Sequence, residues 1–259
     1  MKRVLTFIIS MMLVLTACMG LTACGGEETS AITDNKLTIG YTKYEPMNYF
    51  DKDTGDFVGF DTELAKLFCE EIGVEAEFVE INWDNKFIDL ASKNIDCIWN
   101  GMTITDEVKE KTAVSNPYLE NRQVVVCKKE IASKFTDIAS LKNAASVVFE
   151  DGSAGEKVAV AAGIDESKMI PAEAQKDTLL EVASGNSEIA IIDQTMAKVL
   201  TGFGTSYSDL TYVDVGFELE EFGVSFRKSD AGLAKAFDLF IKSCKLNGTF
   251  LLLQAKYFA

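Results

Sequence analysis

The sequence predicts an α/β fold made of two half-size units that face one cleft. Between residues 37 and 99, strand-length apolar runs and helical stretches follow one another as strand, helix, strand, helix, strand, which is typical of a parallel sheet. In addition, residues 90–98 and 182–191 share one pattern, namely the end of a helix, a short polar turn and an apolar strand. Any helix–turn–strand unit gives this pattern, so the repeat by itself leaves the two-unit arrangement open.

The composition is that of a globular protein without histidine chemistry. The chain has 259 residues, 47% hydrophobic and 25% charged, enough for one large domain or two small ones. Its formal net charge of −15 argues against nucleic acid and anionic membrane surfaces as partners. The sequence has no histidine, which excludes Ser-His and Cys-His nucleophile pairs, and it has no P-loop or Gly-x-Gly-x-x-Gly pattern. We therefore expect neither a cofactor nor a metal site.

The N-terminal segment is expected to lie outside the fold. A basic pair precedes an apolar run at 4–15 that is too short to span a bilayer, as in a signal peptide. A small residue before Cys24 and two glycines after it resemble the bacterial lipobox, in which the cysteine is lipidated and the chain is cut just before it. This makes 1–23 the signal peptide and 24–36 a lipid-anchored polar tether. The alternatives are lipidation at Cys18 and a plain secretory signal.

Apolar spacing predicts the elements of the first unit in chain order. Asp61 is expected to cap the first helix and Gly73 to end it. The expected elements are a strand at 37–41, a helix at 61–72, a strand at 76–81, a helix at 86–92 and a strand at 95–99.

The last of these strands leads into the stretch where we expect a ligand. Residues 95–99 are apolar, residues 100–103 read as a polar turn with a glycine, and Thr105 is a good N-cap for a short helix. Ligands of open α/β sheets bind outside the carboxyl ends of the strands. The alternative is an ordinary turn between a strand and a helix.

A second set of elements follows, and the chain then returns with a strand and two helices. The expected elements are strands at 124–127 and 146–149, a Gly-rich turn at 150–155, helices at 156–162 and 176–184, a strand at 188–192, a helix at 194–200, extended chain at 211–215, a strand at 222–227, a helix at 233–244 and a last helix ending at 258.

Four cysteines remain beyond the predicted signal peptide and its lipobox. They lie in apolar runs, and their spacings fit no zinc pattern, so we expect small buried side chains. An even number in an exported chain permits disulfides, but the sequence does not give a pairing. These residues are Cys69, Cys97, Cys127 and Cys244.

Five short motifs resemble the extracellular solute-binding proteins of polar amino-acid ABC importers. They are Val58-Gly59-Phe60-Asp61 with Glu63-Leu64-Ala65, Gly101-Met102-Thr103-Ile104-Thr105, Ser115-Asn116-Pro117-Tyr118, Glu221-Phe222-Gly223-Val224-Ser225-Phe226-Arg227-Lys228, and Asn247-Gly248-Thr249. The resemblance implies the two-lobed periplasmic-binding-protein fold of type II, with a first lobe at 37–125 and 217–259 and a second lobe at 126–216. It also implies a monomer that holds an amino acid in the cleft and delivers it to a membrane permease, without covalent chemistry.

The resemblance also implies which residues contact the ligand. Tyr44 and Trp83 match aromatic residues that pack on the ligand, although ordinary core packing would also explain them. Asp193 matches the carboxylate that pairs with the ligand ammonium, and its alternative role is to cap the next helix. The matching positions are Tyr44, Trp83, Asn100, Gly101, Met102, Thr103, Ser153, Ala154 and Asp193. Of these, the backbone N–H groups of Ser153 and Ala154 would bind carboxylate at a helix N-terminus.

One position departs from the family pattern. The family usually has an arginine that binds the ligand carboxylate through two hydrogen bonds, and this chain has Val108 there. Glu150 stands where members often carry a neutral or basic group. With Glu45 and Asp193 it predicts an acidic cleft and a cationic ligand, although a solvated loop charge is the alternative for Glu150.

Three functions remain open from the sequence. The first is a lipid-anchored protein on the outside of the cell membrane that binds an amino-acid-like solute for an ABC importer. The second is an enzyme similar to cyclohexadienyl dehydratases, with Glu150 as the acid. The third is a sensor or scaffold lipoprotein, which the missing arginine favours and which the aromatic residues and Asp193 argue against.

Overall fold

Ten strands form one mixed sheet in the part of the chain that the structure describes. The structure is a computed structural model, and it describes residue 32 and residues 34–258. The strands of this sheet are β1 (Lys36–Tyr41), β4 (Glu75–Glu80), β5 (Cys97–Thr103), β6 (Ala113–Val114), β7 (Leu119–Lys128), β8 (Val147–Glu150), β9 (Met169–Ala172), β10 (Ile189–Asp193), β11 (Leu210–Val213) and β12 (Leu219–Phe226). A separate short pair consists of β2 (Tyr49–Phe50) and β3 (Phe57–Val58).

Helices connect these strands. The α-helices are α2 (Phe60–Ile72), α3 (Lys86–Ala91), α4 (Asp106–Lys111), α5 (Ala154–Ala161), α6 (Gln175–Ser184), α7 (Gln194–Leu200), α8 (Ala231–Asn247) and α9 (Thr249–Phe258). The 3-10 helices are η1 (Trp83–Asn85), η2 (Lys129–Lys134), η3 (Ile138–Asn143), η4 (Glu166–Lys168) and η5 (Lys228–Asp230). No helix among the described residues has the length and hydrophobicity to cross a membrane. The predicted signal peptide, both candidate lipidation cysteines and most of the tether lie outside the described residues.

The sheet contains two parallel sets of strands joined by two long antiparallel strands. The strand order is β4-β1-β5-β12-β7-β10-β8-β9, with β6 beside β12 and β11 beside β7. Within it, β4, β1 and β5 are parallel, as are β10, β8 and β9. The strand β12 is antiparallel to β5 and β7, and β7 is antiparallel to β10. This is the two-lobed periplasmic-binding-protein fold that the resemblance implied.

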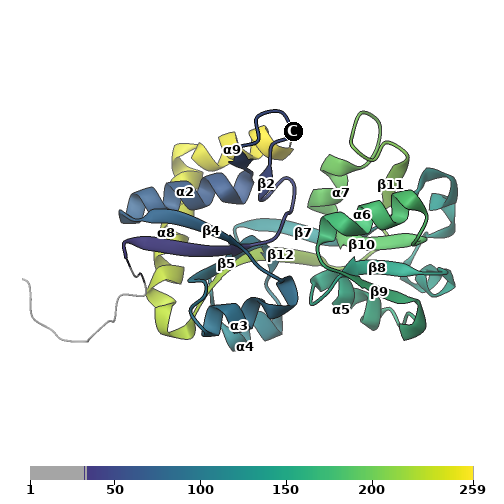
Figure 1. The fold of residues 1–259 in the computed structure, drawn as a ribbon, viewed down its shortest axis with the longest axis horizontal. Helices are drawn as coiled ribbons and strands as arrows, with labels where there is room; N and C mark the ends of the chain where they lie inside the picture. Colours follow the sequence, from purple (N-terminus) through teal and green to yellow (C-terminus); the bar gives the residue numbers. More distant parts are fainter. Residues whose placement is uncertain (1–31, 33, 259) are drawn as a thin grey trace, which may run out of the picture. The chain divides into compact units, whose positions relative to one another are not determined.

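Each parallel set has its own helices (Figure 1). We call β1 and β4–β6 with α2–α4, α8 and α9 the first lobe, and β8–β11 with α5–α7 the second lobe. The strand β7 pairs with β12 at residues 119–122 and with β10 at 123–127, so it joins the two lobes. The predicted order strand, helix, strand, helix, strand is confirmed as β1, α2, β4, α3 and β5.

The predicted polar turn at 100–103 is wrong, because these residues are the second half of β5. Thr103 pairs with Phe222, and Met102 pairs with Gly223 of β12. Gly101 has φ +56, and the register with β12 shifts beside it. The strand continues because its polar side chains have hydrogen-bond partners inside the protein, which sequence spacing does not reveal.

The predicted N-cap at Asp61 is also wrong. The cap of α2 is Gly59, with φ +135, and a Cβ there would lie 2.1 Å from the carbonyl oxygen of Met47. Asp61 is instead a fully buried residue of the first turn. The predicted end at Gly73, in the left-handed conformation, is confirmed, and so is the cap at Thr105, whose Oγ1 accepts from Val108 N at 3.3 Å.

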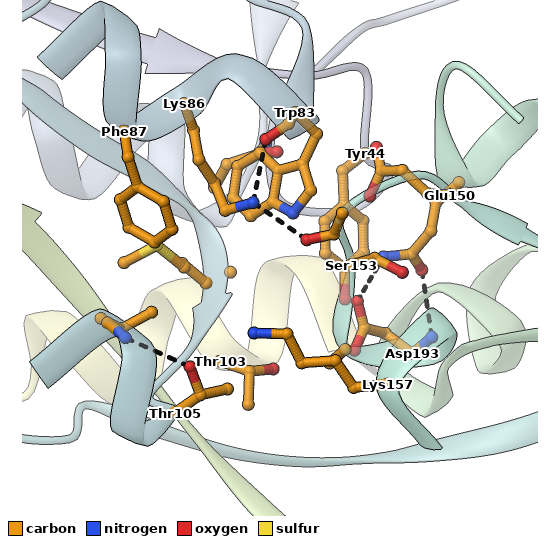
Figure 2. A pocket seen from close by; sticks show the side chains of 17 residues that line it. Tyr44, Trp83, Lys86, Phe87, Thr103, Thr105, Glu150, Ser153, Lys157 and Asp193 are labelled. Atoms are coloured by element: carbon orange, nitrogen blue, oxygen red, sulfur yellow. Dashed lines mark hydrogen bonds between the residues drawn. The ribbon is translucent and has the colours of Figure 1, made fainter. Parts of the chain in front are cut away.

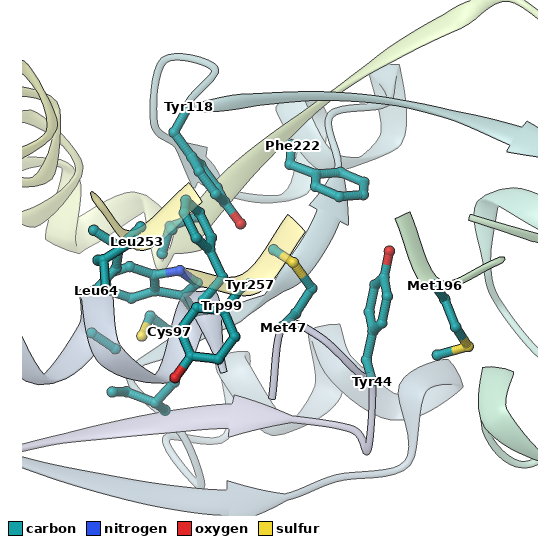
Figure 3. Close-up of a cluster of buried hydrophobic side chains, with 14 of the residues drawn as sticks. Tyr44, Met47, Leu64, Cys97, Trp99, Tyr118, Met196, Phe222, Leu253 and Tyr257 are labelled. Carbon is teal, nitrogen blue, oxygen red and sulfur yellow. The ribbon is translucent and has the colours of Figure 1, made fainter. Parts of the chain in front are cut away.

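Aromatic and sulfur-containing side chains fill the core next to the strand ends. Trp99 meets Phe237 edge to face, with ring centroids 4.8 Å apart. Tyr44 lies between Met47 of the first lobe and Met196 of the second (Figure 3). The four described cysteines are buried and free, which confirms their expected packing role.

Candidate functional site

A cavity lies where the carboxyl ends of strands from both lobes meet. The empty space between its walls is about 470 Å³, a figure that includes the part open to solvent. All predicted site residues lie in its wall, together with six that the sequence did not single out. The predicted ones are Tyr44, Trp83, Asn100, Gly101, Met102, Thr103, Val108, Glu150, Ser153, Ala154 and Asp193; the additional ones are Lys86, Phe87, Thr105, Gly152, Lys157 and Gln175.

The two predicted aromatic residues belong to both the core and the cavity wall. Tyr44 is 1% exposed and Trp83 is 7% exposed, and both line the cavity. Trp83 opens η1, which the Asn82 side chain caps by accepting from the backbone N–H groups of Asp84 and Asn85. The two interpretations of these aromatics are therefore compatible, because buried rings form the cavity wall.

Asn100 is a positioning residue whose side chain is fully engaged within the protein. Its Oδ1 accepts from Thr42 N at 3.0 Å and from Thr42 Oγ1 at 2.8 Å. Its Nδ2 donates to Thr42 O at 2.9 Å and to Asn48 Oδ1 at 2.8 Å. An amide side chain has two donor hydrogens and two acceptor lone pairs, so no capacity remains for a ligand. Asn100 therefore holds the loop that carries Tyr44.

A buried carboxyl holds the backbone of β5 from behind the cavity. Gly101 N donates to Asp61 Oδ2 at 2.7 Å, and Tyr118 OH donates to Asp61 Oδ1 at 2.8 Å. Burial raises the pKa of Asp61 to about 7, although both of these donors lower it. The Gly101 N–H is therefore not free for a ligand, and no sequence pattern predicted this role for Asp61.

Asp193 lies in the cavity wall at the end of β10, held by side-chain amides. Its carboxylate accepts from Gln123 Nε2 at 2.8 Å, from Gln175 Nε2 at 2.5 Å and from Asn121 Nδ2. Burial, and next the nearby Glu220, raise the pKa of Asp193 to about 7. It occupies the N-cap position of α7, but its side chain makes no capping bond. The Tyr44 hydroxyl also lies close enough to this carboxylate to lower its pKa.

The N-terminus of α5 faces the same cavity. Ser153 caps this helix, because its Oγ accepts from Glu156 N at 3.2 Å. The Ser153 N–H donates to Glu150 O, whereas no described residue accepts from the N–H of Ala154. This open N–H and the positive end of the helix dipole favour an anionic group here.

Lys157 lies one helical turn further along α5 and reaches towards the first lobe. Its Nζ lies 2.5 Å from Glu107 Oε2 of α4. Figure 2 shows its ammonium group above Thr103 and near Thr105, whose Oγ1 accepts from the backbone N–H of Val108. Val108 is 3% exposed and packs in an apolar cluster with Met102. The cavity therefore has a cation near the position of the missing arginine, supplied by the other lobe.

Lys86 and Glu150 form a second charged locus beside Trp83. Lys86 Nζ donates to Trp83 O and to Gly152 O, each at 2.9 Å, so it also joins the lobes. Burial lowers the pKa of Lys86 to about 8. Burial, and next the charge of Asp193, raise the pKa of Glu150 to about 8. Glu150 is 3% exposed, so the alternative of a solvated loop charge is wrong.

The prediction of a purely acidic cleft needs correction. Glu45 is not part of the described cavity wall. The wall contains Lys86 and Lys157 as well as Glu150 and Asp193, so it carries both signs of charge. No group of three acidic or cysteine side chains among the described residues has the arrangement of a metal site.

Comparisons with known proteins agree on one family. The model of the family described as bacterial extracellular solute-binding proteins, family 3, matches residues 37–259. The chain is 30% identical to the arginine-binding extracellular protein ArtP of Bacillus subtilis (strain 168), over 96% of this chain and 97% of that protein. It is 29% identical to the L-cystine-binding protein TcyA of the same organism, over 92% of each chain. A crystal structure of the ancestral amino acid-binding protein AncCDT-1, a precursor of cyclohexadienyl dehydratase, has a TM-score of 0.80 and 29% identity, over 90% of this chain and 100% of that one.

Proposed function

Because the chain belongs to the bacterial extracellular solute-binding proteins of family 3, we propose that it is the amino-acid-binding lipoprotein of an ABC importer. One observation carries the amino-acid assignment: a buried carboxylate and an anion-binding helix N-terminus face the same small cavity. An amino acid carries one ammonium and one carboxylate on the same carbon, which is the complement of this pair. The names of the relatives ArtP and TcyA support the same class of ligand.

Asp193 would bind the α-ammonium of the ligand. Three amide donors hold its carboxylate in place, and the Tyr44 hydroxyl lies beside it, so a ligand ammonium would share the carboxylate with these groups. A ligand ammonium beside Asp193 would also stabilise its ionised form, which burial disfavours. Binding is then coupled to ionisation of this side chain.

The α-carboxylate would bind at the N-terminus of α5. The open N–H of Ala154 provides one donor, and Lys157 provides the charge that the family arginine would supply. Because Lys157 belongs to the second lobe and Val108 to the first, the positive charge would come from the opposite lobe to the one that carries the family arginine. An ammonium group acts as a point charge and lacks the planar fork of a guanidinium, so the carboxylate is held less rigidly.

The rest of the predicted mechanism follows from the two-lobed fold. The lobes would close on the ligand about β7 and β12, with lobe boundaries at 125/126 and 216/217, and the closed form would dock on a membrane permease. Lipidation at Cys24 would keep the protein at the outer face of the cell membrane. Mass spectrometry of Cys24→Ser and Cys18→Ser variants expressed in bacteria tests the anchor, because only the acceptor variant loses the lipid mass.

A thermal-shift screen tests the amino-acid assignment. The purified protein, freed of ligand by unfolding and refolding, is heated with each of the common amino acids, cystine and polyamines. Because a ligand that binds only the folded state raises the melting temperature, at least one amino acid should raise it by several degrees at 100 times its Kd. A screen in which no amino acid changes the melting temperature would contradict the proposal.

A second candidate is an enzyme on this fold, which the burial of Glu150 favours. Its raised pKa, about 8, keeps the carboxyl protonated at neutral pH, as acid-catalysed loss of water requires. The similarity to a precursor of cyclohexadienyl dehydratase points to the same class of reaction. Incubation with prephenate and arogenate, followed by their absorbance, tests it: turnover that Glu150→Gln abolishes would establish this function instead.

A further inference from the structure

Lys86 and Glu150 line the cavity but have no role in the proposed binding of the α-ammonium and α-carboxylate of the ligand. Lys86 is 6% exposed, and its Nζ makes two hydrogen bonds, to Trp83 O and Gly152 O. An ammonium has three donor hydrogens, so one N–H remains beyond these bonds. The two carbonyl groups fix Nζ in place, and the rings of Trp83 and Phe87 lie 5.0 Å from it.

Glu150 lies at the same end and also has spare hydrogen-bond capacity. Its Oε1 has a long contact of 3.4 Å from Thr42 Oγ1. Figure 2 shows Lys86 and Glu150 on the side of Trp83 and Tyr44, whereas Lys157 lies on the opposite side with Thr103. The two loci thus lie on different sides of one small cavity, with a fixed cation and a carboxyl at this one, and Lys157 is still close enough to lower the pKa of Lys86.

We propose that this end of the cleft selects a ligand side chain whose terminal group is net neutral and carries both a hydrogen-bond acceptor and a donor. The proposal rests on the proposed function, because it assumes that the α-ammonium and α-carboxylate occupy the other end. The acceptor would take the remaining N–H of Lys86, and the donor would contact Glu150. Two long side-chain ends that have this chemistry are a carboxamide and a second amino-acid end with its own ammonium and carboxylate.

Other side chains leave one of the two groups unsatisfied. A guanidinium or ammonium would face the fixed charge of Lys86, and like charges in a buried site repel strongly. A carboxylate would gain Lys86 and keep Glu150 protonated, but it would lie close to the charge of Asp193. An aliphatic side chain would leave both buried polar groups without a partner, which is costly in a site from which water is excluded. The cleft is therefore expected to discriminate against arginine and lysine.

Calorimetric titration of the ligand-free protein with L-glutamine, L-cystine, L-arginine, L-lysine and L-glutamate tests the inference. We expect glutamine or cystine to bind at least tenfold more tightly than the other three. Arginine, lysine or glutamate binding as tightly as the better of glutamine and cystine would overturn the inference and leave the proposed function standing. Binding of no amino acid at all would overturn both.

Variants identify the residues responsible and the type of ligand. Lys86→Met should weaken binding of the preferred ligand about tenfold or more, whereas Lys109→Met, at an exposed position of α4 outside the cavity wall, should leave it unchanged. Unchanged affinity in Lys86→Met, with a folded circular dichroism spectrum, would contradict the inference. Glu150→Gln separates the two ligand types. A carboxamide ligand keeps a hydrogen bond to the new side chain, so its affinity should fall less than about threefold. A ligand with an ammonium end loses an ion pair, so its affinity should fall at least about tenfold. The selectivity of the unaltered protein decides the matter if Lys86→Met does not fold.

Discussion

In the proposed function, Lys157 of the second lobe supplies the positive charge that Val108 of the first lobe lacks. It follows the α5 cap, Ser153, by four residues, and its ammonium group lies in the cavity beside Thr103. In the described structure its partner is Glu107, whose pKa hydrogen bonds from Lys111 and Lys157 lower to about 2. Because Glu107 also pairs with Lys111 at 2.8 Å, it keeps a partner when Lys157 turns to a ligand carboxylate.

Two substitutions separate ligand binding by Lys157 from its contact with Glu107. Lys157→Met should weaken amino-acid binding about 10- to 100-fold, because a charge-assisted hydrogen bond is worth roughly 1.5–3 kcal/mol. Glu107→Gln should leave the affinity unchanged or raise it, because it frees Lys157. Titration calorimetry measures both. Equal losses in the two variants would show that Lys157 acts only by joining the lobes.

The residues that the sequence predicted for the site all lie in the cavity wall, but the prediction missed Lys86 and Lys157 for a physical reason. Both follow a predicted site residue at helical spacing: Lys86 is three residues after Trp83, and Lys157 is four after Ser153. This spacing was the available signal. A lysine on a short helix usually lies in solvent, and only the position of the other lobe decides whether it faces a cavity.

At the scale of elements, the ends of β5, β8 and β10 place the site. Each ends at a residue of the cavity wall, namely Thr103, Glu150 and Asp193. The strand periodicity predicted these elements, because buried apolar runs mark strands whatever their partners are. It did not predict that β5 continues through Asn100, because the interactions that satisfy its polar groups come from Thr42 and Asn48, more than 50 residues earlier.

Gly152 provides an element-scale test of lobe closure. It has φ +66, and a Cβ there would lie 2.9 Å from the Cα of Asp84 in the other lobe. Gly152→Ala should therefore hinder closure of the lobes and weaken ligand binding about tenfold or more. This figure assumes that one or two hydrogen bonds of the closed form are lost.

The matched control is Gly55→Ala. Gly55 has φ +76, but nothing lies within 4 Å of an added Cβ. Both variants should lose about 1–2 kcal/mol of stability from the left-handed backbone conformation, and only Gly152→Ala should lose affinity. Unfolding by urea and titration calorimetry measure the two quantities. The same affinity in both variants would show that the lobes need not approach this closely.

For the whole molecule, three buried carboxyls make stability depend on pH. Burial raises the pKa of Asp61 and Asp193 to about 7 and that of Glu150 to about 8. Between about pH 4 and 7 the folded state therefore holds protons that the unfolded chain has lost, so stability falls as pH rises. Burial lowers the pKa of Lys86 to about 8, so its contribution begins only above pH 8. There the unfolded chain holds a proton that the folded state has lost, and this contribution makes stability rise with pH.

The melting temperature of the ligand-free protein is therefore expected to fall by several degrees between pH 5 and 8. Asp61→Asn should reduce this fall, because it removes one of the three carboxyls and keeps an acceptor for Gly101 N and Tyr118 OH. Asp53→Asn, at an exposed position, is the control and should not change it. A melting temperature that rises over this range would contradict the prediction.

A crystal structure of the protein with its preferred amino acid would show whether Asp193 and the N-terminus of α5 bind the two backbone charges of the ligand. We expect the α-ammonium nitrogen about 3 Å from an Asp193 carboxylate oxygen, and the α-carboxylate on Ala154 N and Lys157 Nζ at similar distances. A ligand bound elsewhere on the surface, or one in the cleft with its α-carboxylate remote from both Ala154 and Lys157, would contradict this expectation.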